Sequence, residues 1–120
     1  MRLKDKVAIV TGAAGGMGAA TARIFAREGA KVVLTDLNEA DGQKVAREIG
    51  NTAMFVKHDV AKEADWQAVA DQAMKSFGRI DILVNNAGVS GSDPDRLSIE
   101  TWDQQMSINA KGVFLGLRTI

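Results

Sequence analysis

The chain has no cysteine, no tyrosine and a single proline among its 120 residues. Without cysteine it can form neither disulfides nor thiolate metal sites, which is compatible with a reducing cytosol. Without tyrosine it has no phenol that could serve as an acid or a base. Fifteen basic side chains balance fifteen acidic ones, so no net field favours nucleic acid or an anionic membrane.

Long apolar runs are also missing. Val7–Val10 is too short for the core of a signal peptide or for a membrane span. We therefore expect a cytoplasmic protein with no membrane and no nucleic-acid partner. The length allows one domain, and 46% apolar with 25% charged residues is typical of a globular fold.

Short apolar runs alternate with longer helical patterns along the chain. The expected strands are Val7–Thr11, Val32–Thr35, Ala53–His58 and Ile80–Asn85. The expected helices are Gly16–Glu28, Glu39–Ile49 and Lys62–Phe77. A glycine follows each helix, as a left-handed stop requires. This alternation is typical of right-handed βαβ units and predicts an α/β fold with a doubly wound parallel sheet.

A fourth helix is expected from Ser98 onward, after a polar loop over Ser90–Arg96 that holds the proline. Its pattern continues without a stop to Ile120, which would leave apolar surface uncovered. We therefore expect one domain over residues 1–120 that is truncated within this helix. Trp66, Trp102 and the five methionines are interpreted as packing residues.

A glycine-rich turn, Thr11–Gly18, joins the first strand to the first helix. Free N–H groups and the helix dipole at such a helix start attract an anion such as a pyrophosphate. Glycine there keeps β-carbons away from the phosphate oxygens. The glycines at 12, 16 and 18 do not have the Gly-x-Gly-x-x-Gly spacing of the commonest dinucleotide motif, and a flexible connection is the alternative.

Asp36 ends the second strand, 18 residues after Gly18. A carboxylate at this position can accept hydrogen bonds from both hydroxyls of the adenosine ribose. The same charge would repel a 2′-phosphate, and neither Arg nor Lys follows directly. The pattern favours NAD over NADP, with a solvated loop aspartate as the alternative.

The third strand ends in Asp59 and Val60. In a parallel sheet this end faces the cofactor crevice, where Asp59 could contact the adenine amino group while Val60 covers the ring. Asp59 could equally cap the next helix. His58 has no partner at metal-binding spacing, so we assign no metal ligand and expect an exposed or strand-end residue.

The fourth strand ends in Asn85, Asn86, Ala87 and Gly88. Two asparagines at the end of a buried strand need hydrogen-bond partners. The small residues after them would let a flat ribose or ring lie against the backbone. The alternative is an asparagine turn that only ties neighbouring strands together, a role for which Asn85 is the candidate.

Asn109 interrupts a face of the fourth helix that also carries Trp102, Met106 and Val113. We expect a buried amide there, and a buried amide needs a reason. Satisfied core packing is the alternative to a functional role.

Together these motifs resemble the short-chain dehydrogenase/reductase family over essentially the whole chain. The resemblance implies a Rossmann fold with strand order 3-2-1-4. It further implies binding of NAD(H) or NADP(H) and hydride transfer to or from the carbonyl or secondary alcohol carbon of a small molecule. A homodimer or homotetramer is the expected assembly of a complete member.

The resemblance also implies a role for each quoted residue. The pyrophosphate would lie among Gly12, Gly16, Met17 and Gly18, and the rest of the cofactor would meet Asp36, Asp59, Val60, Asn86, Ala87 and Gly88. Asn109 resembles the active-site asparagine that kinks its helix and helps hold a water in a proton relay. The family's catalytic serine, tyrosine and lysine are expected downstream of Ile120, and the 120 residues alone are expected to be inactive.

Two other functions fit part of the pattern. A catalytically silent dinucleotide-binding module would need no tyrosine. A methyltransferase also places an acidic residue after its second strand to hold a ribose, although Asn85–Gly88 argues against it.

Overall fold

The computed structural model describes residues 1–89 and 98–120. Its sheet has four parallel strands in the order β3-β2-β1-β4, so the expected order is confirmed. The strands are β1 (Val7–Thr11), β2 (Lys31–Asp36), β3 (Ala53–Lys57) and β4 (Ile82–Val84). The loop expected over Ser90–Arg96 lies outside the described residues.

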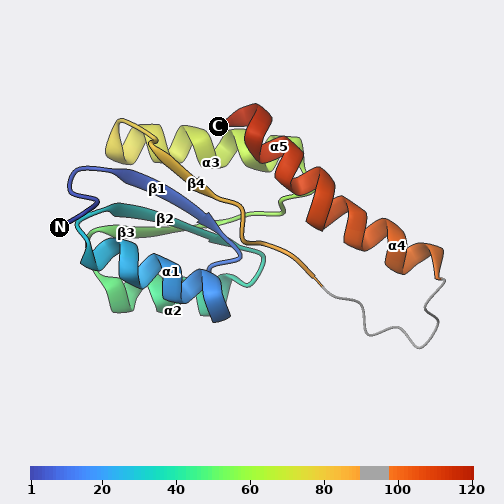
Figure 1. Ribbon diagram of the computed structural model, residues 1–120, viewed down its shortest axis with the longest axis horizontal. Coiled ribbons are helices and arrows are strands. Elements are labelled where there is room, and N and C mark those ends of the chain that lie inside the picture. The colour runs from blue at the N-terminus through green and yellow to red at the C-terminus, as the bar shows by residue number, and fades with distance from the viewer. Residues whose placement is uncertain (90–97) are drawn as a thin grey trace.

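Helices cover both faces of this sheet. They are α1 (Gly16–Arg27), α2 (Glu39–Ile49), α3 (Glu63–Phe77), α4 (Ile99–Met106) and α5 (Gly112–Thr119). As Figure 1 shows, α1 and α2 lie on one face, α3 and α5 lie on the other, and α4 projects past the sheet. The three layers are those of a doubly wound α/β fold.

The strands divide their side chains between the two faces, because successive residues of a strand point in opposite directions. Val10 and Leu34 pack with α1 and α2, while Ile9 and Val33 pack against α3. All four side chains have no exposed surface. The central position of β1 and β2 therefore accounts for their continuous apolar sequence.

A third cluster joins α5 to α3 and contains Val60, Trp66 and Leu115. Two glycines of α5 permit the close approach. A β-carbon on Gly112 would lie 2.7 Å from Val60, and one on Gly116 would lie 2.6 Å from the Trp66 ring. The packing role expected for Trp66 is confirmed, since its side chain is fully buried.

The fourth helix begins after Ser98, as expected, and the Ser98 hydroxyl accepts a hydrogen bond from the amide of Thr101 at 3.3 Å. It is not one continuous α-helix. A π-helical turn, η1 (Ser107–Lys111), separates α4 from α5. A π turn holds one residue more than an α-helical turn between hydrogen-bonded groups, so it changes which side chains of the following helix face the core.

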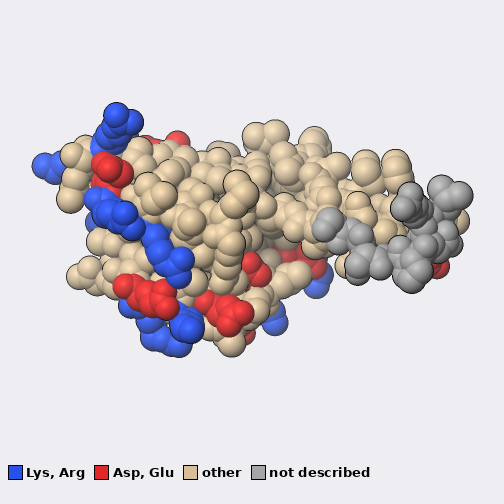
Figure 2. Space-filling view, turned by 60° about the horizontal axis from the view of Figure 1, so that its bottom comes forward, with Lys and Arg blue, Asp and Glu red and all other residues tan. Residues whose placement is uncertain are grey.

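The packing role expected for Trp102 and for most methionines is wrong. Trp102 is 65% exposed, and Met1, Met17, Met74 and Met106 are exposed as well. Trp102 and Met106 belong to α4, which projects past the sheet and presents mostly uncharged surface in Figure 2. Among residues 1–89 and 98–120, no helix is long and apolar enough to cross a membrane.

Candidate functional site

The carboxyl ends of the strands surround a hollow of about 120 Å³. Six of the residues that line it are among those selected from the sequence, namely Gly12, Asp36, Asp59, Val60, Ala87 and Gly88. They come from the ends of all four strands, which the parallel topology brings to one edge. Leu37, His58, Val89 and Ile108 complete the lining and were not assigned to the site.

The Thr11 hydroxyl ties the end of β1 to the segment after β4. Its oxygen accepts hydrogen bonds from the amides of Asn86 and Ala87, each at 3.0 Å. Thr11 is 1% exposed, so these bonds form away from water. No role was expected for this hydroxyl, although a polar residue at the end of a buried strand needs such partners.

The glycines of the turn serve two purposes. Gly12 and Gly16 have φ values of +64° and +56°, which favour glycine. A β-carbon on Gly18 would overlap the Gly12 carbonyl oxygen, and one on Gly12 would lie 2.8 Å from Cα of Ala87. Gly12 and Gly18 therefore permit close chain packing rather than phosphate approach alone.

Gly15 and Gly16 face open space instead. Beyond the adjacent backbone, a β-carbon on either would have no described atom within 4 Å. Gly15 is also the N-cap of α1, and in the described chain that helix start has neither a side-chain cap nor an acidic residue in its first turn. The amides at this end remain able to meet an anion. Met17 lies beside them and is 80% exposed.

The Asp36 carboxylate is fixed by backbone groups on both sides. Oδ2 accepts from the Ala14 amide at 3.0 Å, and Oδ1 accepts from the Asn38 amide at 2.9 Å. Because a carboxylate offers about four lone-pair positions, each oxygen keeps acceptor capacity. This side chain is therefore ordered rather than a freely solvated loop aspartate.

Asp59 forms a tight turn at the end of β3. Its Oδ1 accepts from the Ala61 amide at 2.9 Å, and its own amide donates to Oδ2 of Asp65 at 2.8 Å. The N-cap of α3 is Lys62, so the alternative that Asp59 caps this helix is wrong. The Val60 carbonyl accepts from Nε1 of Trp66 at 2.8 Å, which holds Val60 against the hollow.

Asn86 links the end of β4 to the glycine turn. Its Nδ2 donates to the Gly12 carbonyl at 3.2 Å. Asn86 thus ties the ends of β4 and β1 together, a role that was expected of Asn85. A β-carbon on Gly116 would lie 2.9 Å from Oδ1 of Asn85, which places the other side chain against α5.

Asn109 is exposed, so the buried amide expected there is wrong. Its side chain clamps the backbone of Val89, with Oδ1 accepting from the amide and Nδ2 donating to the carbonyl, each at 2.8 Å. Asn109 lies within η1. The amide therefore finds its partners across the hollow's rim instead of in the core.

His58 was expected to be exposed or at a strand end, and its place at the end of β3 confirms the second possibility while its burial excludes the first. It follows β3 directly, is 1% exposed, and places Nδ1 2.8 Å from the Thr35 hydroxyl. Its ring meets Trp66 edge-on, with centroids 4.3 Å apart. Burial lowers the pKa of His58 from 6.5 to about 4, against the opposing charges of Asp65 and Asp59.

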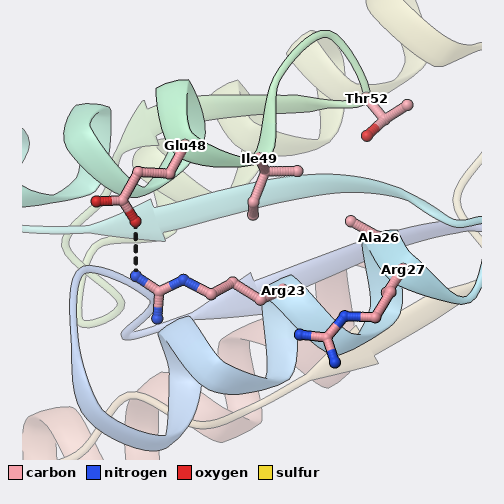
Figure 3. Close-up of a pocket in the computed structure, with 6 residues that line it drawn as sticks. All are labelled: Arg23, Ala26, Arg27, Glu48, Ile49 and Thr52. Atoms are coloured by element: carbon pink, nitrogen blue, oxygen red, sulfur yellow. Dashed lines mark hydrogen bonds and ion pairs between the residues drawn. The ribbon is translucent and has the colours of Figure 1, made fainter.

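A second hollow, between α1 and α2, differs in character. Arg23 and Arg27 project over it from α1, and Arg23 pairs with Glu48 at 2.9 Å (Figure 3). Ile49 and Thr52, from the end of α2 and the turn before β3, complete its lining. The glycine turn and Asp36 are not part of it.

A parallel sheet with a glycine-rich turn and acidic residues at its carboxyl edge defines a Rossmann-type protein. The family model described as short chain dehydrogenase matches residues 6–120. The chain belongs to this family.

Several characterised proteins are similar to the chain. A 3-beta-hydroxysteroid dehydrogenase of Comamonas testosteroni is 43% identical over 116 residues, which are 96% of this chain and 46% of the relative. An NADP-dependent (R)-specific alcohol dehydrogenase of Lentilactobacillus kefiri is 44% identical over 120 residues, which are 98% and 48% of the two chains. The chain spans about half the length of the relatives it matches.

The fold has a close counterpart among solved structures. The crystal structure of a 3-ketoacyl-(acyl-carrier-protein) reductase from Brucella melitensis complexed with NADH superimposes with a TM-score of 0.91. It is 42% identical, and the match covers 97% of this chain and 49% of that one.

Proposed function

We propose that the chain binds NAD(H) at the carboxyl edge of its sheet and is the cofactor-binding part of an oxidoreductase. The whole protein would transfer a hydride between the nicotinamide and a carbonyl or secondary alcohol carbon. The observation that carries this proposal is the convergence of six sequence-selected residues on one hollow. Family membership and the NADH complex of a structural neighbour support it.

The residues fit a dinucleotide in four respects. The open face of Gly15 and Gly16 would take the pyrophosphate, with the N-terminus of α1 behind it. The remaining lone pairs of Asp36 would accept from the adenosine ribose. Asp59 and Val60 would meet adenine, and Asn86, Ala87 and Gly88 would lie on the ribose side.

The choice of NAD over NADP rests on Asp36. Its charge is held in place by two backbone amides, and the next residue, Leu37, carries no positive charge. A 2′-phosphate at this position would meet a fixed negative charge without a countercharge from that neighbour. Because an NADP-dependent relative is 44% identical to the chain, a titration with both cofactors tests this choice directly.

When bound, the nicotinamide would supply the hydride chemistry. Asn109 would help hold a water of the proton relay, since Oδ1 keeps a second lone pair and Nδ2 a second N–H beyond the Val89 contacts. The chain has no tyrosine, so we place the proton-exchanging tyrosine, with its serine and lysine, in the remainder of the whole protein. This chain alone would then bind the cofactor without turnover.

Calorimetric titration of the chain with NADH, NADPH and S-adenosylmethionine tests the proposal. We expect NADH to bind at least about tenfold more tightly than NADPH, a difference of about 1.4 kcal/mol. Tighter binding of NADPH would contradict the cofactor choice. Absence of binding by both nicotinamide cofactors, or preferential binding of S-adenosylmethionine, would contradict the function.

We also propose that the whole protein is a homodimer or homotetramer. Support comes from the large apolar side chains that α4, α5 and the residue after it expose, namely Ile99, Trp102, Met106, Phe114, Leu117 and Ile120. Light scattering of the whole protein should give two or four times the mass of one complete subunit. A monomer mass at micromolar concentration would contradict this part of the proposal.

A further inference from the structure

His58 lies between Asp36 and Asp59, the two acidic residues that line the hollow. Thr35, which its ring contacts, directly precedes Asp36 in β2, and Asp59 and Val60 directly follow His58. The amide of His58 also donates to the Asp36 carbonyl at 2.9 Å. The position of this residue is therefore linked to both strand ends that would hold the adenosine.

Trp66 extends this link to Val60. The His58 and Trp66 rings meet at 88° with their centroids 4.3 Å apart, and Nε1 of Trp66 donates to the Val60 carbonyl at 2.8 Å. Trp66 and His58 are each at most 1% exposed. Such a buried chain of contacts can hold Val60 in one place more firmly than a solvated turn could.

One atom in this cluster lacks a hydrogen-bond partner. Within the described part of the chain, Nε2 of His58 is the buried side-chain nitrogen or oxygen without one. His58 lines the hollow together with Asp36, Asp59 and Val60. An unpaired polar atom in a buried site is costly, and a partner inside the hollow would remove that cost.

We propose that His58 is a positioning residue for the adenosine half of the site, and that its Nε2 gains a hydrogen-bond partner when adenosine fills the hollow. The partner is a polar atom of the adenosine or a water that the adenosine encloses. This inference rests on the proposed function. It adds that the affinity for adenosine depends on the buried side chain of His58.

The chain has a single histidine, so nitrogen NMR of histidine-labelled protein reports on Nε2 without ambiguity. The probe is ADP-ribose, and reduced nicotinamide mononucleotide, which has no adenosine, is the matched ligand. We expect ADP-ribose to shift the Nε2 resonance and the mononucleotide to leave it in place. An Nε2 resonance that saturating ADP-ribose does not move would overturn the inference.

Affinity gives a second, separate readout. His58→Gln should weaken ADP-ribose binding roughly fivefold to tenfold and change binding of reduced nicotinamide mononucleotide less than about twofold. Glu48→Gln, in the hollow between α1 and α2, is the control and should change neither. Thr35→Val removes the hydroxyl that contacts Nδ1 and serves as the second variant if His58→Gln does not fold. It should likewise weaken ADP-ribose binding and leave binding of the mononucleotide nearly unchanged.

These results separate the inference from the proposed function. If the parent chain binds neither NADH nor ADP-ribose, both fail. If it binds them and the variants lose no ADP-ribose affinity, or lose equal affinity for both probes, the positioning role of His58 fails while cofactor binding stands.

Discussion

The amide nitrogen of Ala14 donates a 3.0 Å hydrogen bond to Oδ2 of Asp36, which connects the glycine-rich turn to the end of β2. One carboxylate thus contributes to the shape of the turn and carries the charge we assign to ribose selection. Changes at Asp36 should therefore affect the contacts of both the adenosine ribose and the pyrophosphate of a bound ADP-ribose group.

Asp36→Ala should weaken NADH binding by about 1–3 kcal/mol, because the ribose loses a charged acceptor and Ala14 loses its partner. Asp36→Asn keeps one carbonyl oxygen, so its affinity for NADH should lie between those of Asp36→Ala and the parent. Calorimetry measures both, with Glu48→Ala as the control. If Asp36→Ala binds NADH as tightly as the parent, the ribose assignment is wrong.

Gly15→Ala and Gly18→Ala should separate cofactor access from chain packing. Gly18→Ala should lower the free energy of unfolding by about 1–3 kcal/mol or more, because its β-carbon would overlap the Gly12 carbonyl. Gly15 has an extended φ of −167° and open space beside it. Gly15→Ala should leave that free energy within about 0.5 kcal/mol and still weaken NADH binding.

Urea denaturation and calorimetry distinguish these two variants. A Gly18→Ala protein as stable as the parent would contradict the packing role of that glycine. Full NADH affinity in Gly15→Ala would place the pyrophosphate elsewhere.

Trp66→Phe should lower the free energy of unfolding by about 2–3 kcal/mol, because it leaves a void and deprives the Val60 carbonyl of its donor. Trp102→Phe is the matched control. Because Trp102 is 65% exposed, this variant should change the free energy of unfolding by less than about 0.5 kcal/mol. Urea denaturation measures both, and equal losses would contradict the assigned burial of the two rings.

Stability should decline on acidification through His58. Its pKa is about 4 in the folded protein against 6.5 for the free side chain, so between these values the unfolded chain binds a proton that the folded chain does not. The contribution of neutral His58 to the free energy of unfolding is fully present above pH 6.5. It decreases toward pH 4 by at most about 1.4 kcal/mol per pH unit.

The His58→Gln variant isolates this effect, because it removes the imidazole and leaves every other ionisable side chain in place. The free energy of unfolding should fall more steeply with decreasing pH in the parent than in the variant. Parallel curves between pH 6.5 and 4 would contradict the shifted pKa.

Local sequence pattern was sufficient for the strands and helices, while the strand order was implied by the resemblance to the short-chain dehydrogenase/reductase family. The buried runs around Val10 and Leu34 are unmistakable because both faces of a central parallel strand must be apolar. The glycine turn and the acidic strand ends could be placed together for a related reason, since parallel strands bring their carboxyl ends to one edge. The six residues that share the hollow follow from topology.

Contacts between distant elements could not be predicted in the same way. His58 is buried because Thr35 and Trp66, on two other elements, enclose it. Asn109 satisfies its amide on Val89, and the π-helical turn around it breaks the helical periodicity used to place it in the core. Trp102 has a helical pattern around it and is nevertheless 65% exposed, because helical periodicity alone does not determine what packs against a helix face.

The contrasting surroundings of the two indoles also give the protein its own optical probes. Trp66 lies in apolar surroundings next to the hollow, so its emission should be shifted to the blue and should respond when a ligand enters. Trp102 is in contact with solvent, should emit further to the red and can be quenched selectively with acrylamide. Occupancy of the site and the environment of α4 can thus be followed separately without attaching a dye.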